Sequence, residues 1–413
     1  MGSCHSKEDG KPNLQTSSAY HPTREAEARV ITPLASIDRS DGAVENLAVH
    51  EGAILGIASA GNSEFVTCGE DKALRLHDHV GESGSFRNSL SFTGHTKAVA
   101  RANYGVTTRL VYSCSRDTTI RQWSRSGSSA LRVFEGHDMA CTALALSADE
   151  RTLSSGSRDT SIRMWDVQTG QCTASAKIPR NLVTCLNYLS GGSSAFVVQG
   201  GEDLRLRVWD VREAGLRPSM TIEGYTFFPL CLDVSACGHE VMTSCKGFNG
   251  TGCETKLWDL RHTRMTLREY TGHTQDTTAC VFFETPRRRV VSEERRGDEG
   301  AGGESDACGV APASAPHHRM VATVSKDETA KIYDRDSGEI VVDHAEPGCG
   351  GYTGLAVQHD LVTGSPILYA STITGGLYAL RLEANRATGV AAGGGAEGWR
   401  LRCVGFVRGT AIL

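Results

Sequence analysis

One spacing recurs along the 413-residue chain: an aspartate is followed, six residues later, by an aromatic ring. The clear pairs are Asp71 with His77, Asp117 with Trp123, Asp159 with Trp165, Asp203 with Trp209, and Asp327 with Tyr333. Weaker copies centred on Trp258 and Tyr378 bring the ring positions to seven. Five of the six steps between them measure 42 to 49 residues, close to the roughly 40–45 residues of one propeller blade.

Strand-like segments lie between these anchors. Residues 142–147 (TALALS) and 161–167 (SIRMWDV) alternate apolar and polar side chains, with the period of two that is typical of a half-buried strand. A single repeat of this kind cannot bury its own faces, whereas repeats arranged radially cover each other and leave few open edges. The sequence therefore predicts an all-β chain folded as a seven-bladed β-propeller.

Two repeats carry a further pattern around the aspartate. A histidine precedes the aspartate by 22 residues, and a serine precedes it by four. The two sets are His95, Ser113, Asp117 and Trp123, and His137, Ser155, Asp159 and Trp165. We expect each set to form one buried hydrogen-bonded tetrad, which satisfies the polar groups that a blade hides from water.

Other repeats keep only part of this set. In the first, Thr67 stands in the serine position and His77 in the tryptophan position. In the fourth, Gln199 takes the serine position and Asn181 lies near the histidine position. The fifth replaces the turn with a glycine-rich loop, Cys245–Cys253. The sixth fills the four positions with His273, Thr323, Asp327 and Tyr333.

Composition divides the chain into three parts. Residues 1–43 are polar and predict a disordered tail, whereas residues 44–382 contain the repeats. Residues 285–318 mix charge, Gly, Ala and Pro without apolar periodicity, which predicts a disordered insertion in blade six. Residues 383–413 form a glycine-rich tail.

Two segments compete for the outer strand of the seventh blade. Residues 43–49 would join the two ends of the chain in one sheet, and residues 401–407 would fill the same place from the C-terminal side. The N-terminal segment is the favoured interpretation.

The Gly-His, turn-Asp and Trp-Asp pattern resembles the WD-repeat superfamily over residues 44–382. Residues 115–123, 156–171, 202–210 and 243–264 (TSCKGFNGTGCETKLWDLRHTR) are similar to the WD repeat-containing protein 31 family, as is the N-terminal start. Residues 285–318 and the glycine-rich tail depart from that family. The resemblance implies a scaffold connected with cilia or flagella and membrane-associated trafficking, beside regulators of small GTPases.

The first residues, MGSCHSK, fit the pattern for N-myristoylation. Gly2 would be exposed after removal of Met1, and Ser6 stands at the hydroxyl position. A single myristoyl chain binds membranes only marginally, so a second signal is needed; Cys4 supplies one through S-palmitoylation. The alternative is an ordinary N-terminus that happens to match a short pattern.

A set of charged residues stands directly before the turn aspartates: Glu70, Arg116, Arg158, Glu202 and Lys326. We expect them to project from one rim of the ring. Arg116 and Arg158 belong to adjacent blades and together suit an acidic peptide through bidentate contacts. An ordinary solvated rim is the alternative interpretation.

Two consecutive blades end in W-D-x-R, with Arg212 and Arg261 as the arginines. These endings resemble substrate receptors of cullin-4 ubiquitin ligases, in which the arginine faces the adaptor. The alternative is a local ion pair with a nearby carboxylate, worth about 0–1 kcal/mol.

Several functional classes are disfavoured. A net charge of −5 and a pI near 6.3 argue against a nucleic-acid surface. Neither a phosphate-binding loop nor a nucleophile elbow is present, so no catalytic residues and no cofactor are predicted. The 14 cysteines form no C-x-x-C pair, which indicates reduced thiols and no metal site. We expect a non-catalytic, monomeric propeller that holds partner proteins within a larger complex, on the cytoplasmic face of a membrane, in a cilium or flagellum.

Overall fold

The computed structural model describes residues 50–407, except for 62–63, 81–84, 191–194, 213–214, 263–264, 287–316, 361–363 and 385–398. The predicted tail, Gly2 and Cys4 therefore lie outside the described residues, as does most of the predicted insertion. Within this part of the chain all regular structure is β-strand. No helix there is long and apolar enough to span a membrane.

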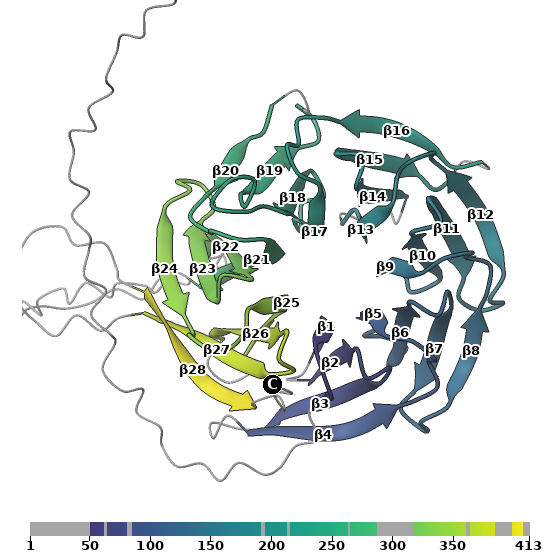
Figure 1. Cartoon of the computed structure of the whole chain (residues 1–413), viewed down its shortest axis with the longest axis horizontal. Coiled ribbons are helices and arrows are strands. Elements are labelled where there is room, and N and C mark those ends of the chain that lie inside the picture. Colours follow the sequence, from purple (N-terminus) through teal and green to yellow (C-terminus); the bar gives the residue numbers. More distant parts are fainter. Residues whose placement is uncertain are drawn as a thin grey trace, which may run out of the picture. The chain divides into compact units, whose positions relative to one another are not determined.

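The strands form seven four-stranded antiparallel sheets, and each sheet uses four consecutive strands (Figure 1). Blades one to four consist of β1 (Ile54–Gly61), β2 (Glu64–Gly69), β3 (Leu74–Val80) and β4 (Ser85–Phe92); β5 (Val99–Tyr104), β6 (Leu110–Ser115), β7 (Ile120–Ser124) and β8 (Ala130–Phe134); β9 (Cys141–Leu146), β10 (Thr152–Ser157), β11 (Ser161–Asp166) and β12 (Cys172–Lys177); β13 (Val183–Tyr188), β14 (Phe196–Gly201), β15 (Arg205–Asp210) and β16 (Arg217–Ile222).

Blades five to seven follow the same order. They consist of β17 (Pro229–Val234), β18 (Glu240–Cys245), β19 (Thr255–Asp259) and β20 (Arg268–Tyr270); β21 (Thr277–Pro286), β22 (His317–Ser325), β23 (Thr329–Asp334) and β24 (Ile340–Ala345); β25 (Tyr352–His359), β26 (Pro366–Thr372), β27 (Leu377–Ala384) and β28 (Trp399–Val407). The prediction of an all-β, seven-bladed propeller is confirmed. Both ends of the predicted insertion belong to strands, because β21 runs to Pro286 and β22 begins at His317.

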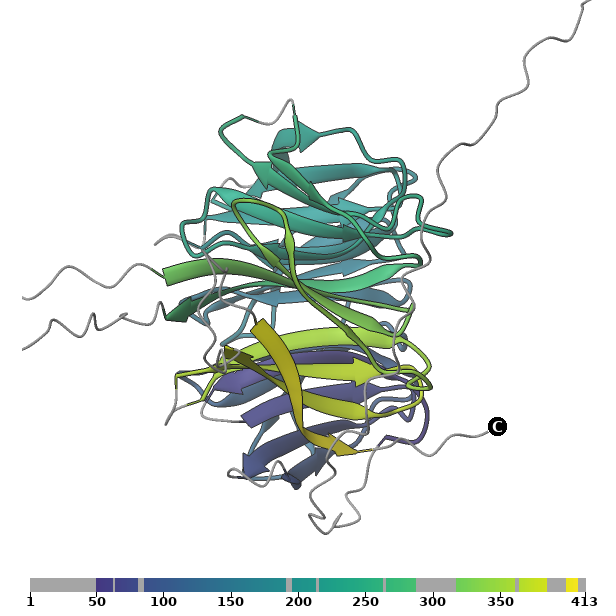
Figure 2. The same cartoon turned by 90° about the vertical axis from the view of Figure 1, so that its left-hand side faces the viewer.

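Burial follows the position of a strand within its blade. The second strands β2, β6, β10 and β14 share one pattern, with five consecutive buried residues, because neighbouring blades cover both of their faces. The outermost strand β12 instead alternates between exposed and half-buried residues. Figure 2 shows the blades from the side, stacked against one another. The hydrophobic core therefore lies between neighbouring blades, and each part of it is built from residues of more than one blade.

The turn between the second and third strands has one backbone shape in six blades. In five of these blades the residue after the turn aspartate has a positive φ. Blade seven has no turn aspartate, but Gly375 occupies the equivalent position and also has a positive φ (80°). The five residues that follow a turn aspartate are Lys72, Thr118, Thr160, Leu204 and Glu328, with φ between 63° and 74°. Asp117 Oδ1 accepts the N–H of Thr119 across this turn at 3.0 Å, and such bonds hold the strained conformation in place.

The strand register of blade seven shows that its predicted aromatic position is wrong. The register shift between the third and fourth strands falls between Gln122 and Trp123 in blade two, and between Ala379 and Leu380 in blade seven. Leu380, rather than Tyr378, therefore occupies the tryptophan position. The sequence prediction chose Tyr378 because the only aromatic ring near the expected spacing stands there.

Blade seven is completed by β28, which pairs with β27 from the Leu377 and Val407 pair to the Ala384 and Trp399 pair. The favoured N-terminal closing strand is wrong, because β28 already occupies that edge of blade seven; residues 43–49 themselves lie outside the described residues. The propeller therefore extends beyond residue 382, to Val407.

Blades one and seven meet without sharing a strand. Thr353 Oγ1 of β25 donates to the Ile54 carbonyl of β1 at 2.5 Å. The rings of Phe65 and Tyr369 stack across the same boundary with centroids 4.7 Å apart. Side-to-side packing between two complete sheets therefore closes the circle.

Relief of the turn strain is testable in blade two. Replacing Thr118 with Gly should raise the free energy of unfolding by about 1 kcal/mol, because a β-branched side chain is disfavoured at φ 74°. Urea denaturation measures the change. Gly375→Ala, at the equivalent position of blade seven, is the matched reverse change and should lower the unfolding free energy by a similar amount. Destabilisation by Thr118→Gly would contradict the argument.

Candidate functional site

The structure brings the residues of each predicted tetrad together. In blade two, His95 Nδ1 lies 2.8 Å from Asp117 Oδ2, and His95 Nε2 lies 2.8 Å from Ser113 Oγ. Trp123 Nε1 donates to the same Ser113 hydroxyl at 2.9 Å. The four side chains thus form one chain of hydrogen bonds from the turn to the tryptophan ring.

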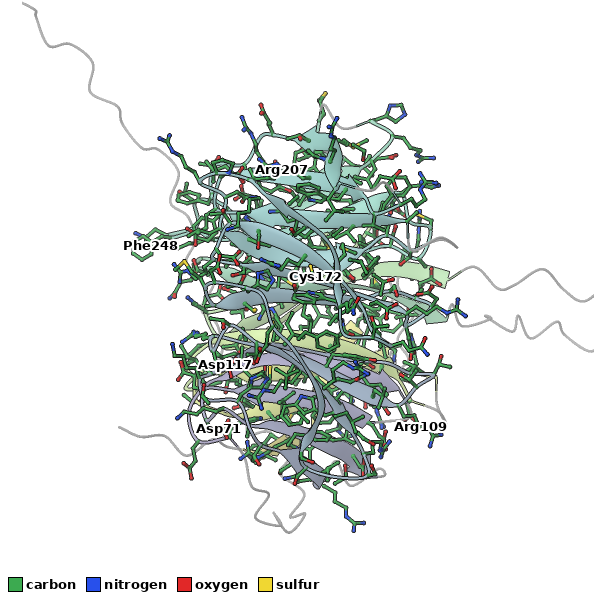
Figure 3. All side chains as sticks on the ribbon, turned by 90° about the vertical axis from the view of Figure 1, so that its right-hand side faces the viewer. Asp71, Arg109, Asp117, Cys172, Arg207 and Phe248 are labelled. Carbon is green, nitrogen blue, oxygen red and sulfur yellow. The ribbon has the colours of Figure 1, made fainter. Side chains whose placement is uncertain are left out.

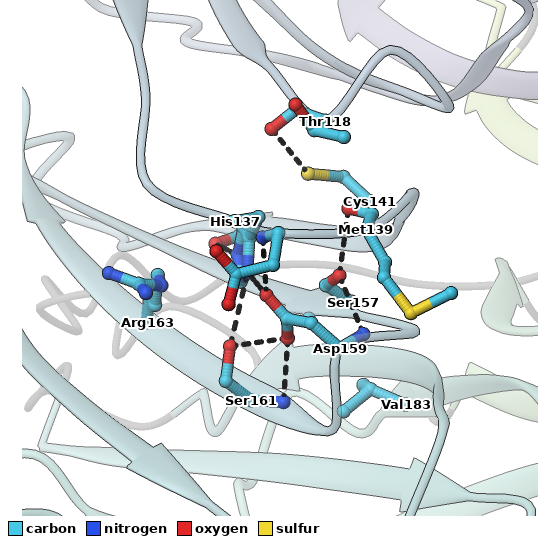
Figure 4. Close-up of polar contacts among 12 residues, drawn as sticks. Thr118, His137, Met139, Cys141, Ser157, Asp159, Ser161, Arg163 and Val183 are labelled. Atoms are coloured by element: carbon cyan, nitrogen blue, oxygen red, sulfur yellow. Dashed lines mark hydrogen bonds and ion pairs between the residues drawn. The ribbon is translucent and has the colours of Figure 1, made fainter.

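Blade three repeats this geometry. His137 Nδ1 lies 2.9 Å from Asp159 Oδ2 (Figure 4). Ser155 Oγ lies 2.8 Å from His137 Nε2 and accepts the indole N–H of Trp165 at 2.8 Å. Because a carboxylate only accepts, the histidine proton belongs on Nδ1, and Nε2 is left to accept from the serine hydroxyl. The histidine in this arrangement is neutral.

A fifth group, which the sequence prediction missed, completes these clusters. The hydroxyl two residues after the aspartate donates to the aspartate and also contacts the histidine. Ser161 does so in blade three, at 2.5 Å from Asp159 Oδ1 and 3.1 Å from His137 Nδ1. Thr119 and Thr329 occupy the same position in blades two and six. The sequence pattern Asp-x-Ser/Thr could have identified this hydroxyl group.

Blade one also has a histidine that the sequence prediction missed. His50 lies 2.7 Å from Asp71 through Nδ1 and 2.8 Å from Thr67 Oγ1 through Nε2. It stands 21 residues before Asp71, whereas the histidines of blades two and three stand 22 residues before their aspartates, and this one-residue difference concealed it. His77 contacts Thr67 Oγ1 from the tryptophan position, at 2.8 Å.

The remaining blades vary the polar groups. In blade four the Asn181 amide lies 3.0 Å from Asp203 and 2.8 Å from the Gln199 amide nitrogen, and Trp209 Nε1 donates to Gln199 at 3.3 Å. Blade six keeps His273 between Asp327 and Thr323, but Tyr333 donates to a backbone carbonyl, that of Thr271. In blade five, Tyr225 takes the histidine position and contacts Thr243 at 2.9 Å.

The electrostatics favour a neutral His77, a neutral His137 and an ionised Asp159. Burial alone would raise the pKa of Asp159, but hydrogen bonds from Ser161, the Asp138 N–H and His137 outweigh it and lower that pKa to about 2. Burial lowers the pKa of His137, although Asp159 opposes the shift. Burial also lowers the pKa of His77 to about 3, and its Nδ1 meets no hydrogen-bond partner among the described residues.

These shifts make stability depend on pH below neutrality. A histidine whose folded pKa lies below 6.5 takes up its proton mainly in the unfolded chain, so unfolding becomes easier as the pH falls through 6.5. In the original protein the unfolding free energy should fall between pH 7 and pH 5. Replacing His77 with Phe should make this fall smaller by about 2 kcal/mol. Urea denaturation at each pH measures this loss. The exposed His239, changed to Phe, is the control and should leave the pH dependence intact. An unaltered pH dependence in His77→Phe would contradict the lowered pKa of His77.

The ends of the second strands present seven equivalent side chains, which we call the turn rim. Each is the residue that follows the second strand of its blade, and its N–H donates to the carbonyl directly before the inner strand of that blade, at 2.9 to 3.0 Å. The seven are Glu70, Arg116, Arg158, Glu202, Lys246, Lys326 and Ile373. All seven side chains are exposed. The predicted rim omitted Lys246 and Ile373, because blades five and seven lack the turn aspartate that served as the marker.

The turn rim has an uneven charge. Within the described residues neither Arg116 nor Arg158 makes an ion pair. Lys326 is instead bound to Asp276 at 2.7 Å, and the Lys246 ammonium lies 5.0 Å from the centre of the Phe228 ring. The strongest uncompensated positive charge on the turn rim is therefore at blades two and three.

Large apolar side chains accompany these charges. Phe248, two residues beyond Lys246, is 69% exposed, and the rim residue Ile373 is 47% exposed. Figure 3 places Asp71, Asp117 and Phe248 toward one face of the ring and Arg109 toward the other. The face with the turn rim thus combines apolar and charged contact groups, as interfaces do.

The two W-D-x-R arginines are held by the aspartate two residues earlier. Arg212 donates to both carboxylate oxygens of Asp210, at 3.0 and 2.6 Å. Arg261 does the same with Asp259, at 3.0 and 2.8 Å. The two arginine side chains are 65% and 62% exposed. The local ion pair that was the alternative interpretation is present in both blades, and it fixes the two guanidinium groups in matching positions.

No group of three or more ligand side chains in the described part of the chain is placed to hold a metal ion. The cysteines of that part are all free thiols.

A family model described as "WD domain, G-beta repeat" matches residues 86–124 and 128–166. Each match covers the last strand of one blade and the first three strands of the next, so the sequence repeat is offset from the structural blade by one strand. The two WD40 repeats and the seven-bladed ring together support the WD-repeat superfamily.

Proposed function

We propose that this WD40 propeller is a non-catalytic scaffold that holds partner proteins on its turn rim, at the cytoplasmic face of a membrane. The observation that carries the proposal is the equivalence of the seven rim positions. A backbone hydrogen bond fixes each rim position, and in most blades a buried polar cluster supports the turn. Side chains presented on so rigid a frame lose little conformational entropy when a partner binds, which favours affinity.

Blades two and three are the part of the turn rim best suited to a specific contact. Arg116 and Arg158 stand at the same place in adjacent blades, and neither is engaged by a carboxylate of the described chain. Guanidinium groups bind carboxylates through two parallel hydrogen bonds. A partner segment that carries two acidic side chains matches this arrangement.

Charge reversal tests the turn rim. Arg116→Glu combined with Arg158→Glu should reduce co-purification of rim-dependent partners at least tenfold, because attraction to an acidic segment becomes repulsion. Quantitative affinity purification measures the loss. Arg109→Glu combined with Arg151→Glu is the matched control, since these exposed arginines belong to the same two blades but to the loops between the first and second strands. Equal losses in both double variants would reject the turn rim as the binding surface.

The membrane part of the proposal rests on the sequence of the first seven residues. Gly2 supplies the myristoylation site and Cys4 the second, reversible acyl chain that stable anchoring requires. Similarity to the WD repeat-containing protein 31 family favours a place in ciliary or flagellar trafficking, or beside regulators of small GTPases.

Removal of the acceptor glycine tests the anchor. Gly2→Ala should move most of the protein from the membrane fraction to the soluble fraction, because neither acyl chain is retained once myristoylation fails. Cell fractionation combined with mass spectrometry of the N-terminal peptide reads out both effects. Ser3→Ala is the neighbouring control and should partition as the original protein does. Unchanged partitioning of Gly2→Ala would remove the anchor from the proposal.

A second candidate function is that of a substrate receptor of a cullin-4 ubiquitin ligase. The matching, exposed and pre-positioned guanidinium groups of Arg212 and Arg261 favour it. In the purification experiment above, Arg212→Ala combined with Arg261→Ala separates the two functions, since only a receptor would lose a ligase adaptor through this change.

A further inference from the structure

Six blades carry a basic residue on the third strand, two positions before the tryptophan position. These residues are Arg75, Arg121, Arg163, Arg207, Lys256 and Lys331. All six are buried or half-buried, and a charge in such a place is costly unless an acid compensates it. Within the described residues, four of the six form an ion pair with a carboxylate.

In blades one and four the turn aspartate compensates the basic residue. Arg75 donates to Asp71 at 2.6 Å, and Arg207 donates to Asp203 at 2.5 Å. The aspartate is available because these two blades lack the serine or threonine, two residues further on, whose hydroxyl elsewhere occupies the carboxylate.

In blades five and six the acid stands on the outermost strand, directly across from the basic residue. The strand register pairs Lys256 with Glu269 and Lys331 with Asp343. The ammonium-to-carboxylate distances are 3.3 Å and 2.6 Å. Blade six needs this second acid, because the Thr329 hydroxyl already occupies its turn aspartate.

Blades two and three offer neither acid. A threonine or serine hydroxyl occupies each turn aspartate, and the cross-strand neighbours of Arg121 and Arg163 are Val133 and Ser175. The two arginines contact uncharged groups: Arg121 donates to a threonine hydroxyl at 3.4 Å, and Arg163 to a cysteine thiol at 3.8 Å. We call Arg121 and Arg163 the outer arginine pair.

Each outer arginine shares a connecting segment with an arginine of the turn rim. Residues 93–98 lead from the outermost strand of blade one to the inner strand of blade two. Arg121 lies at the outer end of this segment, where a Cβ on Gly94 would be 2.8 Å from its Nη1. Arg116 lies at the inner end, where its N–H donates to the Ala98 carbonyl at 2.9 Å. The two arginines are therefore separated by a stretch of chain that spans at most about 14 Å.

Blade three repeats this arrangement. A Cβ on Gly136 would be 3.0 Å from Arg163 Nη1, and the Arg158 N–H donates to the Ala140 carbonyl at 3.0 Å. The glycines of both blades are exposed, and their lack of a side chain leaves room for the guanidinium groups beside them.

The two connecting segments differ in charge. The segment of blade two contains Lys97 and no acid, whereas that of blade three contains Glu135 and Asp138. Asp138 is bound to Lys177 at 3.4 Å. Blade two is therefore the more basic part of this surface.

We infer that the outer arginine pair extends the turn rim outward, so that Arg116, Arg121, Arg158 and Arg163 bind one extended partner segment rich in aspartate and glutamate. The inference rests on the proposed function, because it assigns further residues to the same site. The partner supplies the carboxylates that other blades supply internally, and each guanidinium can bind one through two parallel hydrogen bonds. Packed sheets lie about 10 Å apart, so the ligand that joins two blades is a chain rather than a small anion.

Binding of a fluorescein-labelled deca-glutamate peptide to the full-length protein tests this surface. The peptide reaches about 33 Å when extended, which is enough to cross two blades. Arg121→Gln combined with Arg163→Gln should raise its dissociation constant about tenfold, because two charge-assisted contacts are lost. Arg121→Lys combined with Arg163→Lys keeps the charge without the bidentate geometry and should lose less. Fluorescence anisotropy measures the binding.

The matched control is Arg109→Gln combined with Arg151→Gln, which removes two exposed arginines from other loops of the same blades. Figure 3 places Arg109 toward the face opposite Asp117, so this variant should bind the peptide as the original protein does. Circular dichroism spectra verify that each variant is folded. An equal loss in the control, or equal binding of a deca-glutamine peptide, would overturn the inference.

Arg116→Gln combined with Arg158→Gln separates this inference from the proposed function. Weaker binding by both the rim variant and the outer variant supports the inference. Weaker binding by the rim variant alone would reject the outer arginine pair and leave the turn rim in place. Weaker binding by the outer variant alone would reject the shared site, and weaker binding by neither would also remove the acidic partner from the proposed function.

Discussion

A buried chain of hydrogen bonds between a turn aspartate, a histidine and a hydroxyl controls much of this structure. The aspartate of this chain is cut off from water, so its charge is tolerated only because several donors converge on it. In blade three these are His137, the Ser161 hydroxyl and the Asp138 N–H. The same contacts hold the next residue, Thr160, in a left-handed conformation. In blade three, these contacts with the buried aspartate thus stabilise the shape of a surface turn, and with it the position of the rim residue that precedes the aspartate.

Not every blade needs the full chain of hydrogen bonds. Blade seven has Leu380 and Gly375 where blade two has Trp123 and Thr118, and its turn still takes the same shape. Blade five has Tyr225 in the histidine position and a loop in place of the turn aspartate. These departures are tolerated because each blade is packed against two neighbours, and the burial of apolar surface between blades does not depend on any one polar cluster. The clusters add geometric definition to the turns that carry them.

The arrangement separates two properties in space. The turn rim presents charged and apolar groups on one face of the ring, which suits partner binding. The paired arginines at Arg212 and Arg261 follow the third strands, at the opposite ends of their blades from the turn rim. A ring of nearly equivalent blades allows this, because substitutions in one blade or loop leave the others in place.

The sequence alone determined the number of blades, because an aspartate and an aromatic ring recur at a spacing that only one repeating sheet unit matches. It also identified the tetrads of blades two and three, where all four residue types are present at regular intervals. Weak copies could not be aligned in this way: His50 stands one residue closer to its aspartate, and Leu380 is not aromatic at all. Only the tertiary structure decided these positions, since the backbone turn and the strand register, rather than residue type, define them. It alone also decided that β28 completes blade seven, because this pairing joins residues whose separation in the chain carries no local pattern.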